Sequence, residues 1–149
     1  GWKLVDPEQA SHDSILLEGD IETGLSVLVA LRGPRNGRVE SEAFANQSKL
    51  FERALASLSS GSIFAAMSAN GMAVAAATGD DEALRICNSA IARGAISAGV
   101  TGSGPAIAII CYEQHADSLV EFVRESGMEV IAATFTQSRM QSEEASRWE

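Results

Sequence analysis

The sequence is poor in the residue types that define several large protein classes. Of its 149 residues, two are cysteines, two are histidines, three are prolines and only 5% are aromatic. Cys87 and Cys111 are far apart in the sequence, so neither a disulfide framework nor a metal site with the usual short ligand spacing is expected. The interior must therefore be built mainly from Ala, Val, Ile, Leu and Met, and such small side chains favour close helix packing.

Basic residues are also scarce. The chain has 11 Lys and Arg against 20 Asp and Glu, which gives a net charge of -9. Nucleic-acid binding requires a clustered basic face, and the sequence shows none, so we expect no nucleic-acid partner. No apolar run is long enough to cross a bilayer, and no charged-then-apolar leader opens the chain. We therefore expect no membrane partner and a cytoplasmic location.

The length allows one domain with a substantial core and is too short for two large domains. The chain opens on Gly1 and Trp2 without an initiator Met. This start fits a piece trimmed from a longer protein and fits an expression product equally well.

Hydrophobic spacing predicts the secondary structure. Strands are expected at 24–31, 106–111 and 128–136, with a weaker candidate at 13–20. Helices are expected at 41–58, 62–79, 81–94 and 115–126, with a glycine-rich loop at 97–105. Gly61 should end the first helix, Ser60 or Ser62 should cap the second, and the turn at 78–81 should cap the third. This order predicts an α+β sandwich, with helices on one face of a small, mainly antiparallel sheet.

The glycine-rich loop reads SAGVTGSGP. It is not a phosphate-binding loop of the Walker type, because no Lys-Ser/Thr pair follows a glycine at the required spacing. It is also not a dinucleotide fingerprint, which runs from strand into helix, whereas this loop is expected to run from helix into strand. The loop is either a plain connection, or its glycines adopt positive φ and expose successive N–H groups that accept an anion.

The second helix carries one polar residue on an apolar stripe. Ile63, Met67, Asn70 and Val74 share a helical face, so Asn70 should point inward or into a cleft. Its amide is either satisfied among the packed helices or contacts a ligand.

Two segments resemble a known family. SAGVTGSGPAIAII at 97–110 is similar to the third conserved motif of the GHMP small-molecule kinases, in particular of the archaeal-type shikimate kinases. AAMSANGMAVAAATG at 65–79 is similar to the helix of those enzymes that carries an Asn-Gly pair. The resemblance covers about residues 24–136 and implies the ferredoxin-like C-terminal domain of a GHMP kinase. Residues 1–23 would be an N-terminal extension or edge strand, and 137–149 a tail.

The resemblance also implies site residues. A phosphate loop at the cleft would comprise Gly99, Thr101, Gly102, Ser103 and Gly104. The candidate substrate contacts are Asn70, Arg35 and Arg38. A guanidinium from Arg35 or Arg38 would clamp the carboxylate of shikimate, or these arginines simply form a solvated turn. No residue is expected to be a catalytic base, and none is expected to bind a metal.

The sequence departs from the family in one respect. GHMP kinases bind nucleotide mainly through an N-terminal domain with a Gly-Ser-Ser loop, which this sequence lacks. The resemblance therefore implies the substrate-side half of a shikimate kinase, an enzyme of aromatic amino acid biosynthesis that makes shikimate 3-phosphate. The complete enzyme would use ATP and Mg²⁺, whereas this chain alone should bind neither and should be inactive without its N-terminal half.

Two alternatives stay open. The chain could come from a GHMP kinase of the homoserine or mevalonate pathway. It could also be a non-catalytic ferredoxin-like module for ligand binding or dimerisation, and in either case it could form a homo-oligomer.

Overall fold

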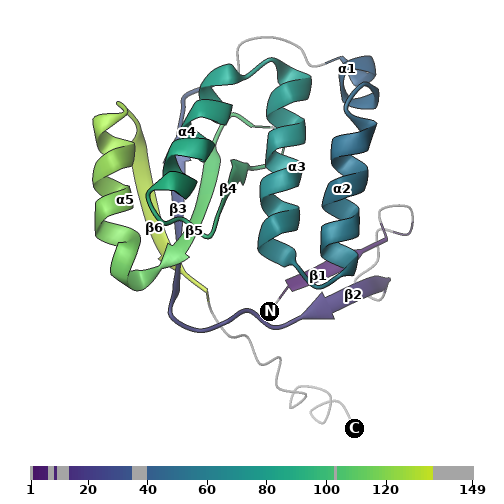
Figure 1. The fold of residues 1–149 in the computed structure, drawn as a ribbon, viewed down its shortest axis with the longest axis horizontal. Coiled ribbons are helices and arrows are strands. Elements are labelled where there is room, and N and C mark those ends of the chain that lie inside the picture. Colours follow the sequence, from purple (N-terminus) through teal and green to yellow (C-terminus); the bar gives the residue numbers. More distant parts are fainter. Residues whose placement is uncertain (1, 7–8, 10–13, 35–39, 103, 136–149) are drawn as a thin grey trace, which may run out of the picture. The chain divides into compact units, whose positions relative to one another are not determined.

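The computed structural model of the chain describes residues 2–6, 9, 14–34, 40–102 and 104–135 (Figure 1). Contacts divide the chain into two units, one formed by Gly24–Thr134 and the other by Gly1–Thr23 with Phe135–Glu149. In the second of these units, strands β1 (Trp2–Val5) and β2 (Ile15–Gly19) pair antiparallel. All other helices and strands belong to the unit Gly24–Thr134.

The larger unit is built on a four-stranded sheet of order β4-β5-β3-β6, in which all neighbouring strands are antiparallel. The strands are β3 (Leu25–Leu31), β4 (Ser97–Val100), β5 (Ile107–Tyr112) and β6 (Glu129–Thr134). Strands β3 and β5 are the two inner strands. The connection from β3 to β4 passes over β5, and the connection from β5 to β6 passes over β3. This is the split βαβ arrangement of ferredoxin-like domains. The predicted α+β class, with a small antiparallel sheet and helices packed against it, is confirmed.

The helices are α1 (Ser41–Ala45), α2 (Ser48–Ser59), α3 (Ile63–Thr78), α4 (Asp81–Ala92) and α5 (Glu113–Glu125). In Figure 1 the four long helices lie in a row, in the order α5, α4, α3, α2. Helix α5 packs on β3, β5 and β6, and α4 packs on β4 and β5. Helix α3 packs on β4 and α4, while α2 packs on α3.

One prediction about the helices is wrong. The single helix expected at 41–58 is divided at Asn46 and Gln47, where Gln47 leaves the helical conformation with φ -102° and ψ 16°. Asn46 is a weak helix former, which favours a break at this point. Ser62 occupies the predicted N-cap position of α3, but its hydroxyl makes no cap hydrogen bond, and the Ser60 hydroxyl donates to the Ser57 carbonyl. The cap expected on α4 is present, since the Asp80 carboxylate accepts from the Ala83 N–H.

The glycine-rich segment also differs from its prediction. Ser97–Val100 forms the buried strand β4, paired antiparallel with β5, so only residues 101–106 connect the two strands. Glycine and small residues have low strand propensity, and here pairing with β5 outweighs that preference. The glycine loop is therefore the turn of a β-hairpin, and it runs from strand to strand.

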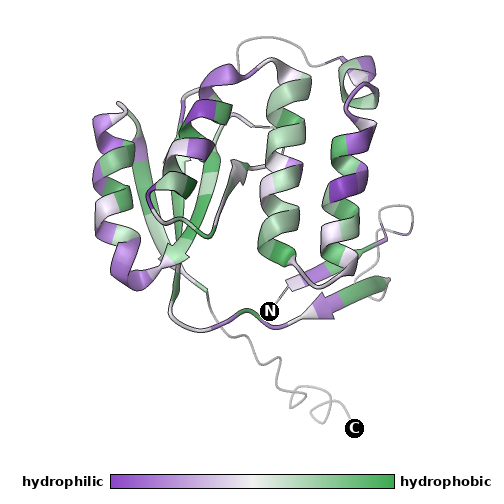
Figure 2. Cartoon of the chain, viewed as in Figure 1, coloured by the Kyte–Doolittle hydropathy of each residue, from purple (hydrophilic) through white to green (hydrophobic). Residues whose placement is uncertain are grey.

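Alternation along the strands places the core between the sheet and the helices. Leu28 and Ala30 of β3 and Ile107 and Ile109 of β5 are completely buried. They meet fully or almost fully buried side chains from α4 and α5: Ile86, Cys87, Leu119 and Val123. Figure 2 shows that α2, α4 and α5 carry hydrophilic faces, whereas α3 is mostly apolar. Such a helix must be covered on more than one side.

Candidate functional site

Helix α3 and strand β4 pack so closely at Gly71 and Gly99 that no side chain fits between their backbones. A Cβ atom on Gly71 would lie 2.4 Å from Gly99 Cα and 2.7 Å from the Val100 nitrogen. A Cβ atom on Gly99 would lie 3.0 Å from the Met67 carbonyl oxygen. Real Cβ contacts are essentially never shorter than 3.0 Å, so glycine is required at position 71 by packing. The second residue of the Asn-Gly pair therefore has a structural role that the sequence does not reveal.

Hydrogen bonds from α3 cover the outer edge of β4. The Ala98 N–H, which points away from β5, donates to the Ser68 hydroxyl at 3.3 Å. The completely buried Ser97 hydroxyl donates to the Phe64 carbonyl at 2.9 Å and lies 2.8 Å from the Ser68 hydroxyl. Because Ser97 gives its proton to Phe64, Ser68 is the donor in the pair between the two serines. These contacts fix the strand that leads into the glycine turn.

The turn between β4 and β5 is closed by its own backbone. The Thr101 N–H donates to the Ala106 carbonyl at 2.9 Å, and the Gly104 N–H donates to the Thr101 carbonyl at 2.8 Å. Gly102 and Gly104 adopt positive φ, +52° and +88°, as the glycine pattern predicts. Gly104 precedes a cis peptide bond to Pro105.

These bonds limit what the turn can offer to an anion. The expected row of exposed N–H groups is interrupted, because the Thr101 and Gly104 amides are used inside the turn. Among the described residues, the Gly102 N–H and the Thr101 hydroxyl make no hydrogen bond to another described residue. Gly99 lies within β4, and Ser103 lies outside the described residues. The donors left for a ligand in the described part of the turn are thus those of Thr101 and Gly102.

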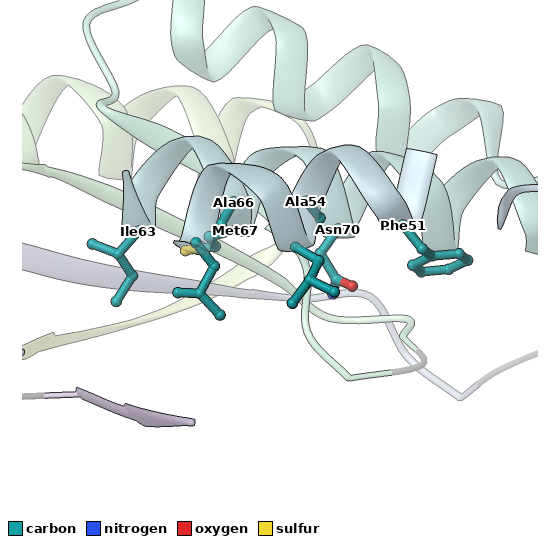
Figure 3. A pocket seen from close by; sticks show the side chains of 8 residues that line it. Phe51, Ala54, Ile63, Ala66, Met67 and Asn70 are labelled. Carbon is teal, nitrogen blue, oxygen red and sulfur yellow. The ribbon is translucent and has the colours of Figure 1, made fainter. Parts of the chain in front are cut away.

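A groove of about 430 Å³ lies between α2 and α3 (Figure 3). Its lining consists of Phe51, Ala54, Leu55, Leu58, Ile63, Ala66, Met67 and Asn70. Leu55 remains 56% exposed there, and Asn70 is the only polar residue of the lining. The sequence predicts that Asn70 points either inward or into a cleft. In the structure Asn70 lines the groove and is exposed there. No described residue of the glycine turn lines this groove. The two regions are linked through Asn70, because the next residue, Gly71, lies against Gly99 and Val100 of β4, the strand that leads into the turn.

A third feature was not anticipated from the sequence. Arg32 follows β3 and makes a bidentate ion pair with Asp80, with Nη–Oδ distances of 2.6 and 2.9 Å. It also donates to Glu82 at 2.6 Å and to the Pro105 carbonyl at 3.3 Å. The Arg32 side chain is only 10% exposed. Arg35 and Arg38, the arginines singled out in the sequence, lie outside the described residues.

The electrostatics of this cluster follow from its hydrogen bonds. The hydrogen bond to Asp80 raises the pKa of Arg32, and the same bond lowers the pKa of the Asp80 carboxyl. Both groups therefore stay charged across the physiological range. The sequence indicates that Arg32 needs a partner but not which one, because Arg32 lies two and four residues after the buried Ala30 and Leu28, on the same strand face. A charge on a buried face needs a partner.

The described residues contain no cluster of three or more His, Cys, Asp or Glu side chains that could hold a metal ion. Asp80 lies near the glycine turn, but both of its carboxylate oxygens are bound to Arg32. Within the same described ranges, no helix is long and apolar enough to span a membrane.

Comparison with known proteins identifies the family to which this domain belongs. The family profile described as GHMP kinases C terminal matches residues 50–128, more than half of the chain. A protein assigned as a homoserine kinase from Listeria monocytogenes is 14% identical, with a TM-score of 0.45 over 76% of this chain and 45% of that chain. The homoserine kinase from Cytophaga hutchinsonii ATCC 33406 is 15% identical, with a TM-score of 0.49 over 85% of this chain and 46% of that chain. No curated protein gives a significant match.

The chain thus spans less than half the length of these two homoserine kinase structures. The profile match runs from α2 through α5. It includes the backbone contact between α3 and β4, the glycine turn and the groove between α2 and α3. This chain belongs to the GHMP kinase family, of which it carries the C-terminal domain.

Proposed function

We propose that this domain forms the acceptor side of an ATP-dependent phosphoryl-transfer site, with shikimate as the acceptor. The observation that carries the proposal is the anchored glycine turn, which leaves the Thr101 hydroxyl and the Gly102 N–H unpaired among the described residues. Phosphoryl transfer depends mostly on positioning and on stabilising charge on the transferred group. Two donors on a fixed backbone are suited to that task.

The groove between α2 and α3 is suited to the body of the acceptor. Its volume of about 430 Å³ lies in the range of small-molecule sites, which are mostly apolar with a few polar groups. In this proposal the ring of shikimate lies on the apolar lining, and the Asn70 amide bonds a ring hydroxyl. Arg35 and Arg38 are the candidates for its carboxylate.

The lining of the groove favours shikimate over homoserine. Homoserine carries an ammonium group, which needs a carboxylate or several carbonyl acceptors when it leaves water. No acidic side chain lines the groove, and Asn70 provides its only polar side chain. The sequence resemblance supports the same choice, because the Gly-Pro-Ala ending and the Asn-Gly helix resemble those of archaeal-type shikimate kinases.

The nucleotide is proposed to bind elsewhere. Among the described residues no three or more His, Cys, Asp or Glu side chains gather into a metal-binding group. The chain also spans less than half the length of the two homoserine kinases. We therefore propose that a nucleotide-binding half, in the same or a separate polypeptide, supplies ATP and Mg²⁺, and that the 149-residue chain alone has no kinase activity.

The test is an ADP-release assay on the full-length gene product with ATP and Mg²⁺. Shikimate, homoserine and mevalonate are offered as acceptors, and the same assay is run on the 149-residue chain. We expect turnover with shikimate by the full-length protein only. The variant Gly102→Val should lose this activity while the protein stays folded by circular dichroism, and Val27→Ala, on the sheet, is its control.

Each other outcome has a defined meaning. Turnover with homoserine alone would leave the kinase proposal standing and overturn the acceptor. Turnover by the 149-residue chain would show that the nucleotide site lies within it. No turnover with any acceptor, together with tight saturable binding of shikimate, would favour a non-catalytic binding module.

A further inference from the structure

We propose that Arg32 is a positioning residue for the glycine turn, which it ties to the N-terminus of α4. The inference rests on the proposed function, because it assigns the turn a part in phosphoryl transfer. It concerns a residue that makes no contact with the groove and is not among the residues that the family resemblance singles out.

The β-sheet register places Arg32 beside the turn. The last paired residues of β3 and β5 are Ala30 and Ile107. Arg32 lies two residues after Ala30, and Pro105 lies two residues before Ile107. Because the strands are antiparallel, this register brings Arg32 and Pro105 opposite each other. The Arg32 guanidinium donates to the Pro105 carbonyl at 3.3 Å. Pro105 lies in the glycine turn, directly before Ala106, whose carbonyl accepts the hydrogen bond that closes the turn.

The other end of the guanidinium is held by α4. Asp80 accepts two hydrogen bonds from Arg32 and a third, at 3.0 Å, from the Ala83 N–H, where it caps the helix. Bidentate pairing of this kind fixes orientation as well as distance. A rigid helix end therefore holds Arg32, and Arg32 in turn holds the C-terminal side of the turn.

The turn is thus anchored on both sides by different means. On the β4 side, the contact between Gly71 and Gly99 fixes the strand against α3. On the β5 side, the Arg32 guanidinium holds the turn through its hydrogen bond to the Pro105 carbonyl. Thr101 and Gly102 lie between the two anchors, and their donors are the ones assigned to the transferred phosphate.

Burial explains why lysine would not be equivalent. The Arg32 side chain is nine-tenths buried, and its planar fork reaches Asp80, Glu82 and Pro105 together. Lysine is a point charge on a flexible stem, so it would keep an ion pair with Asp80 but would not hold the same three acceptors in one geometry. Arg32→Lys should therefore keep the charge and release the turn.

The first experiment measures steady-state kinetics of Arg32→Lys and Asp80→Asn in the full-length gene product. Asn is a good N-cap residue, so Asp80→Asn keeps the helix cap and weakens the ion pair. We expect kcat to fall about 10- to 100-fold in both variants, with little change in the KM for the acceptor, because misplacement acts on the reacting geometry. Arg93→Lys is the matched control, since Arg93 lies over the Phe122 ring, away from the turn, and should keep wild-type kcat.

The second experiment needs no activity. Amide hydrogen exchange of the 149-residue chain is measured by NMR for wild type and both variants. We expect faster exchange at Thr101 and Gly104, with unchanged exchange at Ala98, whose N–H is held by Ser68 on the other anchor. General destabilisation would instead speed exchange at all three amides.

The outcomes separate this inference from the proposed function. Wild-type kcat in Arg32→Lys, or unchanged exchange at Thr101 and Gly104, would overturn the role of Arg32. If the wild-type protein phosphorylates no acceptor, the proposed function fails, and the exchange pattern still decides whether Arg32 positions the turn. Loss of exchange protection at Ala98 as well would make Arg32 a general stabilising residue and would equally overturn the proposal.

Discussion

Helix α3 packs on its two sides in opposite ways. Towards β4 it presents Gly71 and Ser68, and its backbone touches the backbone of Gly99 and Val100. Towards α2 it presents larger side chains, including Ile63 and Met67, and these leave a groove of about 430 Å³. Small residues thus bring the backbones of α3 and β4 together, whereas the larger side chains on the α2 side line an open groove.

The difference shows how one helix serves two purposes. Close packing is intolerant of added volume, so the β4 side fixes positions and suits the support of a turn. The α2 side leaves apolar side chains partly open to solvent, with Leu55 56% exposed, and such surface is where a ligand is usually bound. Substitutions on the two sides should therefore differ strongly in their effect on the free energy of unfolding.

The largest effect is expected for Gly71→Val, compared with Asn70→Val on the open side. A Cβ atom added at position 71 would lie 2.4 Å from Gly99 Cα. We expect a loss of about 3 kcal/mol or more of unfolding free energy for Gly71→Val, because backbone atoms must move apart. Asn70→Val should cost less than about 1 kcal/mol, since position 70 is exposed. Urea denaturation measures both, and equal losses would show that the two sides do not differ.

An intermediate effect is expected for Ser68→Ala. This change removes the acceptor of the Ala98 N–H and the donor to the buried Ser97 hydroxyl. Leaving buried polar groups unpaired costs about 1–3 kcal/mol. Ser118→Ala is the control, because the Ser118 hydroxyl bonds the His115 carbonyl on an exposed surface. Denaturant midpoints that coincide for the two variants would mean that Ser68 does not secure β4.

The smallest effect is expected for Leu55→Ala on the open side. Leu55 is 56% exposed, so little apolar surface returns to water and the cost should stay below about 1 kcal/mol. The same change at Leu119, which is completely buried, should cost about 2–5 kcal/mol. Thermal unfolding of the pair measures the contrast. A Leu55 variant that melts as early as the Leu119 variant would indicate that the groove is closed in solution.

Much of the fold could be predicted because its signals are local. The buried runs of β3 and β5, the apolar spacing of α4 and α5, and the cap at Asp80 all follow from neighbouring residues. Strand β4 was missed because Ser97–Val100 has little strand propensity and becomes a strand only through its pairing with β5.

The candidate site was less predictable for a related reason. Asn70 could be placed near a cleft from its position on an apolar stripe, but its neighbours on α2 come from a separate helix. The Arg32 and Asp80 pair joins residues 48 positions apart, which no local pattern predicts. The requirement for glycine at position 71 likewise depends on the distance to another strand.

The hydrogen bond between Ala98 and Ser68 also bears on self-association. An uncovered strand edge is a template for adding strands from other copies. Helix α3 occupies one outer edge of the sheet, whereas β6 pairs with no described strand other than β3. Two copies could therefore join along β6, but the joined sheet would then present α3 at both ends. Strand addition would stop at a pair and would not continue into a fibre.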